Sequence, residues 1–257
     1  MISVTSAQLL AWIAAFVYPA VRVFAFVATA PVFSNTSIPL RSRVTLGVAL
    51  SVGILPLVDV VPAIDPGSGQ GLFLIAREML VGVAIGFVMR IAFAAVSLAG
   101  ELIGFQMGLG FAVFFDPQST GQTPVISQFV TLLATLVFLA MNGHLMMVAT
   151  LAQSFQLIPI QIALPHPGAW WNIVIWGHKI FAVGLLLSLP VTVALLVTSM
   201  ALGILARAAP QLNLLAIGFP ITIVGGFSIL IMTLWYLSPP LMRLYEAGLT
   251  MMLEFAG

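Results

Sequence analysis

Long, almost uninterrupted apolar blocks are the feature that most constrains how this chain can fold. A helix needs about 20 predominantly apolar residues to cross a bilayer. Six blocks approach or exceed that length, at residues 7–31, 44–61, 72–98, 125–151, 170–202 and 212–237. Only 6% of the 257 residues are charged and 61% are hydrophobic, so too few polar side chains exist to cover a soluble globule of this size. The sequence therefore predicts an all-α, membrane-associated protein.

Several classes of chemistry lack the residues they require. The chain has no cysteine, which excludes disulfides, thiolate catalysis and cysteine-ligated metals. Its three histidines, at positions 144, 166 and 178, follow no metal-binding spacing, and no nucleophile elbow or phosphate loop occurs. A net charge of +1 provides no field that would attract nucleic acid. We therefore expect neither an enzyme nor a bound cofactor.

Ionisable residues inside the apolar blocks leave one alternative function open. Transporters of small molecules or ions place ionisable side chains at mid-span, and Arg22, Arg90 and Glu101 could serve such a role. On a continuous helix, Arg90 and Glu101 would lie roughly 16 Å apart, too far for direct pairing. We interpret Arg22 and Arg90 as pairing with a neighbouring helix or reaching the membrane interface, and we keep a transporter as the alternative.

The segment of residues 100–119 combines four glycines, four phenylalanines and one methionine. Gly108 and Gly110 each weaken a helix by about 1 kcal/mol relative to alanine, yet the segment is too apolar for a solvated loop. Irregular apolar backbone is tolerated at membrane depth only inside protein or along a cavity, and apolar constrictions close channels by excluding water. The segment is therefore either a loop that plugs or gates a pore or a kinked continuation of the preceding helix.

Four stretches, in order along the chain, resemble motifs of the FliR family, the R subunit of the export gate in the flagellar type III secretion apparatus. They are Pro39-Leu40-Arg41-Ser42-Arg43; Gly100-Glu101-x-x-Gly104-Phe105-Gln106-Met107-Gly108-Leu109-Gly110-Phe111 with Asp116-Pro117; Asn142-Gly143-His144; and Ala209-Pro210-Gln211-Leu212-Asn213 with Gly218-Phe219-Pro220. The segments 106–108 and 116–118 are closer to the flagellar branch than to the injectisome branch.

The resemblance implies a fold of bent helical hairpins in two parts. Residues 1–167 would form a P-subunit-like part, and residues 168–257 a Q-subunit-like terminal hairpin. One copy of the chain would join several P and Q subunits, beside other export-apparatus membrane proteins, and unfolded flagellar proteins would pass through the complex. The resemblance places this complex in the inner membrane at the centre of the basal body, partly raised toward the periplasmic side.

The resemblance also assigns roles to particular residues. Residues 104–119 would form the loop that plugs the closed pore, with Met107, Phe111, Phe114 and Phe115 as its seal. Methionine packs adaptably, and glycines would let the loop move aside; static packing against P subunits is the alternative. The plug residues are Gly104, Met107, Gly108, Gly110, Phe111, Phe114, Phe115 and Asp116. Structural or partner contacts are expected at Arg22, Pro39, Arg41, Arg43, Arg90, Glu101, Asn142, His144 and Pro210.

Overall fold

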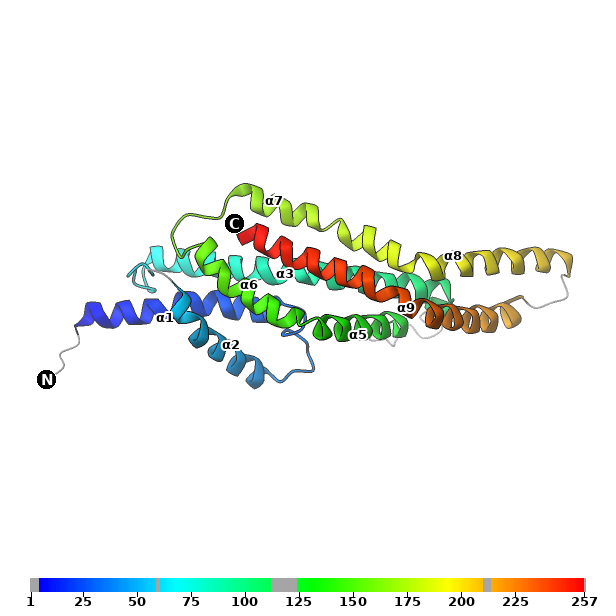
Figure 1. Cartoon of the computed structure of the whole chain (residues 1–257), viewed down its shortest axis with the longest axis horizontal. Helices are drawn as coiled ribbons and strands as arrows, with labels where there is room; N and C mark the ends of the chain where they lie inside the picture. Colours follow the sequence, from blue (N-terminus) through cyan, green and yellow to red (C-terminus); the bar gives the residue numbers. More distant parts are fainter. Residues whose placement is uncertain (1–4, 59–60, 112–123, 210–213, 257) are drawn as a thin grey trace. The chain divides into compact units, whose positions relative to one another are not determined.

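The computed structural model describes residues 5–58, 61–111, 124–209 and 214–256, and within these ranges the regular elements are all helical (Figure 1). The helices are α1 (Ser6–Thr29), α2 (Leu40–Ile54), η1 (Leu55–Leu57), α3 (Gly69–Gln106), η2 (Leu109–Phe111), α5 (Val125–Ala140), α6 (Gly143–Leu157), α7 (Pro167–Trp176), α8 (Lys179–Ala208) and α9 (Leu214–Ala256). The predicted all-α class is confirmed.

Local sequence signals explain where several helices begin and where two expected blocks divide. Thr5 and Gln8 form a capping box at the start of α1, and Pro167 occupies the first turn of α7. The block at 125–151 divides into α5 and α6 because Asn142 adopts a left-handed conformation with φ of 58°. The block at 170–202 likewise falls into α7 and α8, which are separated at Gly177.

The chain packs into two compact units, which we describe separately. The first comprises residues 1–91, 142–177 and 245–257, and the second comprises residues 92–141 and 178–244. This division follows packing in space. The expected division into P-like and Q-like parts concerns relationship to other subunits, and it stays a prediction.

In the first unit, α1 and α3 pack at very short range through two glycines of α3 (Figure 1). A Cβ atom at Gly82 would lie 2.2 Å from the carbonyl oxygen of Arg22, and one at Gly86 would lie 2.2 Å from Oγ1 of Thr29. The Gly82-x-x-x-Gly86 spacing places both small residues on one face of α3 and lets the two backbones approach closely. On another face of α1, Gly47 of α2 lies against the ring of Phe24.

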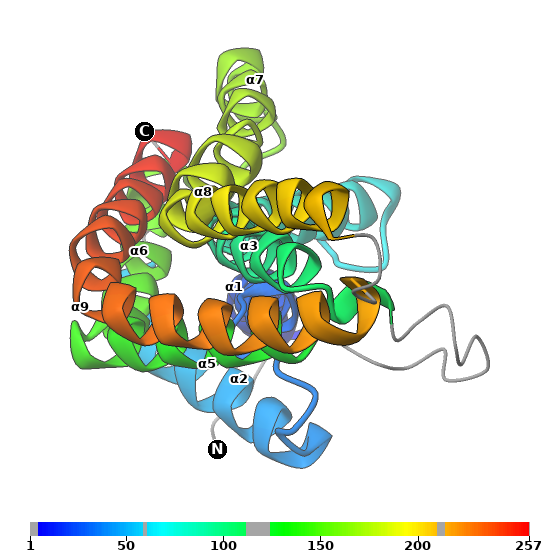
Figure 2. The same ribbon diagram turned by 90° about the vertical axis from the view of Figure 1, so that its right-hand side faces the viewer.

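In the second unit, the end of α3 packs against α5, α8 and α9 (Figure 2). Glycines again set the contacts: a Cβ atom at Gly100 would lie 2.3 Å from Cα of Ser127 in α5, and one at Gly184 of α8 would lie 2.9 Å from the carbonyl oxygen of Ala95. Phe93 and Phe138 pack edge to face, with ring centroids 5.4 Å apart. Small residues therefore bring these helices together, as in many membrane bundles.

The helices differ greatly in how much of their apolar surface this chain covers. Five helical segments, at residues 8–29, 40–57, 69–106, 167–208 and 217–256, are long and apolar enough to span a membrane, and α5 with α6 provides a sixth if that broken pair counts as one span. We compared the most apolar stretch of 18 residues in each segment. This stretch is 67% buried in the α3 segment, but only 17% buried in 40–57 and 11% buried in 217–256. The apolar surface of α2 and of the most apolar part of α9 therefore needs cover from lipid or another protein, whereas the C-terminal part of α9, including Leu241, Tyr245 and Met252, is buried within the chain.

Candidate functional site

The expected plug segment begins where α3 ends. The helical hydrogen bonds continue to Met107, whose N–H donates to the carbonyl of Ile103 at 2.9 Å. At Gly108 the backbone turns into the left-handed region with φ of 84°, a conformation that favours glycine. Gly104 therefore lies within α3. The irregular segment begins at Met107, three residues later than expected, because helical hydrogen bonding persists beyond Gly104.

Met107 is fully buried and joins the end of α3 to α9. Its carbonyl oxygen accepts a hydrogen bond from Oγ1 of Thr222 at 3.2 Å. Its side chain fills the space beside Gly226, where a Cβ atom would lie only 2.5 Å from Cγ of Met107. Met107 thus fixes the near end of the segment in this structure. The sealing role assigned to it stays a prediction.

The residues after Gly108 turn back toward the end of α3 in η2. A Cβ atom at Gly110 would lie 2.7 Å from Cδ1 of Phe105, so Gly110 permits the backbone to approach this ring closely. Phe111 ends η2. Its side chain, together with Phe114, Phe115 and Asp116, lies outside the described residues, and the roles predicted for these four stay predictions.

A small polar network joins α3 to α5 just before this turn. The hydroxyl of Ser127 donates to the carbonyl oxygen of Ser97 at 2.8 Å and lies 3.0 Å from the Ser97 hydroxyl. The Ser97 hydroxyl donates to Oε1 of Glu101 at 3.3 Å. The network orients the half-buried Glu101 carboxylate along the α3–α5 contact, one turn before Phe105.

Two arginines and a glutamate form a buried cluster in the first unit. Nε of Arg22 on α1 lies 2.6 Å from Oε2 of Glu78 on α3, and Nη1 of Arg77 donates to Oε1 of the same carboxylate. Arg22 and Glu78 are fully buried, and Arg77 exposes 1% of its surface. Arg22 therefore pairs with a neighbouring helix, as we interpreted. Sequence reasoning missed Arg77 and Glu78, although adjacent opposite charges inside an apolar block were the available signal.

The remaining cluster contacts are with the end of α6 and the connector that follows it. The Arg22 guanidinium donates to the carbonyl oxygens of Ser154 and Ile158, both at 2.9 Å, and lies 4.2 Å from the centroid of the Phe155 ring. Nε of Arg77 donates to the carbonyl oxygen of Ala163 at 2.7 Å. The cluster carries one excess positive charge. The negative end of the α6 dipole and the face of the Phe155 ring offset it.

The remaining predicted contact residues have varied surroundings. Pro39 precedes α2, and Arg43 donates to the carbonyl oxygens of Ile38 at 3.1 Å and Asn35 at 2.8 Å, thereby supporting the turn before that helix. Arg41 and Arg90 are exposed. Since Arg22 is buried and Arg90 is exposed, the two do not form one polar site.

Two further residues of this set lie at the start of α6. Asn142 has the left-handed conformation described above, and the nearby His144 carries a buried Nδ1 atom without a hydrogen-bond partner among the described residues. Pro210 lies outside the described residues.

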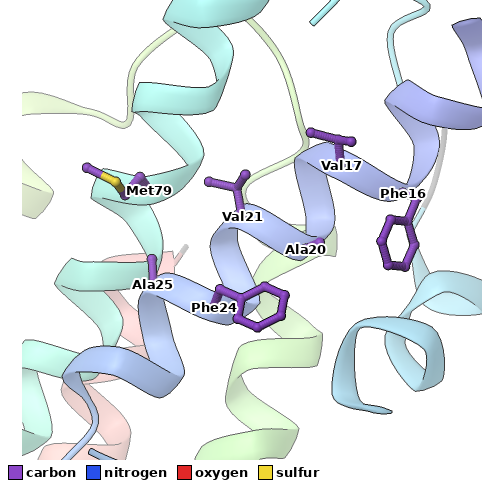
Figure 3. A pocket seen from close by; sticks show the side chains of 7 residues that line it. All are labelled: Phe16, Val17, Ala20, Val21, Phe24, Ala25 and Met79. Carbon is purple, nitrogen blue, oxygen red and sulfur yellow. The ribbon is translucent and has the colours of Figure 1, made fainter. Parts of the chain in front are cut away.

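An open apolar groove of about 440 Å³ runs along α1 (Figure 3). Its lining residues are Phe16, Val17, Ala20, Val21, Phe24, Ala25 and Met79. Met79 comes from α3 and the other lining residues come from α1, as the labels in Figure 3 show. The lining offers no charged side chain to a polar ligand, so the groove suits apolar groups.

Comparison with known proteins gives matches along nearly the whole chain. A family model described as bacterial export proteins, family 1, matches residues 13–248. The flagellar biosynthetic protein FliR of Escherichia coli strain K12 is 41% identical over 232 residues, which cover 90% of this chain and 88% of that protein. FliR of Pectobacterium carotovorum subsp. carotovorum is 40% identical over 241 residues, covering 93% and 90%. FliR of Bacillus subtilis strain 168 is 33% identical over 220 residues, covering 84% and 85%.

Proposed function

The chain belongs to the FliR family of flagellar export proteins, and from this premise we propose that it is the R subunit of the flagellar export gate. Together with P and Q subunits, it forms the channel through which unfolded flagellar proteins are exported. It acts as a structural subunit of this channel rather than as an enzyme.

The observation that carries the proposal is the uncovered apolar surface of α2 and α9. Exposed apolar patches of this extent mark interfaces with other proteins or with lipid. Trp235 and Tyr236 on α9 expose 88% and 78% of their surfaces, and Leu40 on α2 exposes 73%. Sister subunits of an export gate would cover such faces. Membership of the FliR family favours this cover over the solute transporter that we kept as the alternative.

The geometry at the end of α3 supports a movable plug beyond Gly108. Met107 is held on α9, and the left-handed Gly108 separates this fixed residue from the segment that follows. A rigid anchor with a glycine immediately after it would let the following residues change position without disturbing the helices. In the closed gate, Phe111, Phe114 and Phe115 exclude water and ions, and they part when a polypeptide enters.

The proposed place of the complex is the inner membrane at the centre of the flagellar basal body, beside the other membrane proteins of the export apparatus. The apolar helices support membrane localisation. They do not require that every helix meets lipid, because an apolar sister subunit would cover the same surface. From the resemblance to the family, we also propose that the complex stands partly raised toward the periplasmic side.

The plug assignment is tested by deleting residues 108–111 and measuring the ion conductance of membranes that contain the assembled complex. We expect an ion leak, because the seal would lose both its hinge and Phe111. The control is Gly203→Ala, which changes an exposed helical glycine with open space around it. Unchanged conductance in a deletion variant that still assembles with P and Q subunits would refute the plug assignment.

A further inference from the structure

The connector between α6 and α7, residues 158–166, is held by side chains from two distant parts of the chain. Arg22 binds the carbonyl oxygens of Ser154 and Ile158, and Arg77 binds that of Ala163. Ile158 and Ile160 are only 7% and 5% exposed. The connector is therefore bound to α1 and α3 by backbone hydrogen bonds as well as by apolar burial.

Arginine is the side chain that suits this task. Its planar guanidinium presents five donors, so Arg22 can bind a carboxylate and two carbonyl oxygens at once, whereas lysine offers a single ammonium group. Glu78 accepts from both arginines and orients them toward the backbone. Both arginines are thus positioned by the same carboxylate.

The helix that follows the connector is itself fixed by specific contacts. Nε1 of Trp176 donates to the carbonyl oxygen of Val88 at 3.0 Å, and the rings of Trp170 and Phe255 pack edge to face with centroids 5.2 Å apart. The path of the connector consequently decides where α7 begins and which residues it can reach.

We propose that Arg22, Arg77 and Glu78 act as one clamp that positions the connector and α7 for assembly of the export gate. The inference rests on the proposed function in one respect, because it assumes that the chain assembles with P and Q subunits. The clamp itself is a property of this chain. Its three members are positioning residues, because they act through the backbone of residues 154–163.

The experiment uses single cysteines, since the natural chain has none. Ile160→Cys reports on the connector, and Leu187→Cys, at a site that is 6% exposed in the second unit, reports on the rest of the fold. Each is combined with Arg77→Met or Arg22→Met in the full chain, co-expressed with P and Q subunits, and labelled with a maleimide in native membranes. Arg243→Met, at an exposed position, is the control variant.

We expect Arg77→Met to accelerate labelling at position 160 by more than about tenfold and to leave position 187 unchanged. Arg77→Met removes the hydrogen bonds that the guanidinium donates to the Ala163 carbonyl and to Glu78, and a hydrogen bond to a charged group contributes more than the roughly 1.4 kcal/mol that corresponds to a tenfold change. Arg77→Met retains the neutral Arg22–Glu78 pair, so it keeps the test available if Arg22→Met does not fold. The amount of P and Q subunits that copurify should fall in the same variant.

Unchanged protection at position 160 would overturn the clamp, and so would equal loss of protection at positions 160 and 187, which would mean general unfolding. Faster labelling at position 160 with full retention of P and Q subunits would overturn the role of the clamp in assembly. Labelling does not depend on any partner. Selective loss of protection in a chain whose natural form binds no P or Q subunit would therefore support the clamp and refute the proposed function.

Discussion

Replacing Gly100 by alanine tests whether the contact between α3 and α5 is as close as the structure shows. The added Cβ atom would lie 2.3 Å from Cα of Ser127, 2.9 Å from its backbone nitrogen and 3.1 Å from its Cβ atom. Carbon atoms pack at about 3.5 to 4.0 Å, so the two helices must move apart by about 1.2 Å or more. Because two of the three atoms are backbone, a change of rotamer cannot relieve the clash.

The expected magnitude follows from three opposing effects. Alanine in place of glycine favours a helix by about 1 kcal/mol. Overpacking costs about 1–3 kcal/mol, and each weakened hydrogen bond between Ser97 and Ser127 costs a further 0.5–1.5 kcal/mol or so. We therefore expect the free energy of unfolding to fall by about 2 kcal/mol. For a chain of this size that lowers the thermal midpoint by about 4–8 °C.

The assay is thermal unfolding of the detergent-solubilised chain, followed by tryptophan fluorescence. Gly203→Ala is the matched control, because Gly203 is also helical and in the second unit, but a Cβ atom there would have nothing within 4 Å. It should raise the midpoint slightly or leave it unchanged. If Gly100→Ala were as stable as the natural chain, or if both variants were destabilised equally, the close α3–α5 contact would be wrong.

Three further substitutions test other parts of the structure by the same thermal assay. Asn142→Ala should lower the free energy of unfolding by about 1–2 kcal/mol, because the residue has a positive φ, whereas Asn142→Gly should be tolerated; equal effects would contradict the left-handed conformation. Met107→Ala should cost about 2–5 kcal/mol and expose the following segment to added protease, and an unchanged midpoint would refute its burial against α9. Tyr18→Phe removes a 3.0 Å hydrogen bond to the carbonyl oxygen of Ile64 and should cost about 1 kcal/mol; no loss would mean that this bond contributes nothing.

The helical class and most helix positions could be predicted because apolar run length and turn residues are local properties. The block at 72–98 corresponds to α3, and the spacing of Gly82 and Gly86 within it is typical of a helix that packs closely against another helix. The partner helix could not be named, since the spacing specifies how near a neighbour comes and not which neighbour it is. The break at Asn142 was missed although Asn142-Gly143 is a turn signal, because the apolar runs on its two sides were taken as one block.

The buried cluster shows why pairing across the chain is hard to predict. Arg22 and Glu78 are 56 positions apart, and the carbonyl groups that bind Arg22 belong to residues more than 130 positions away. The sequence cannot show which backbone carbonyl accepts a hydrogen bond, because every residue carries one. Apolar composition also does not distinguish a helix covered by lipid from one covered by a sister subunit, so it could not show which of the two covers α9.

The most direct test of the export-gate assignment is native mass spectrometry of this chain, co-expressed with its P- and Q-type partners and released in mild detergent. We predict a complex that holds one copy of this chain with several P and Q subunits. A lone monomer or a homodimer of this chain under the same conditions would contradict the assignment, and the uncovered faces of α2 and α9 would then have to meet lipid alone.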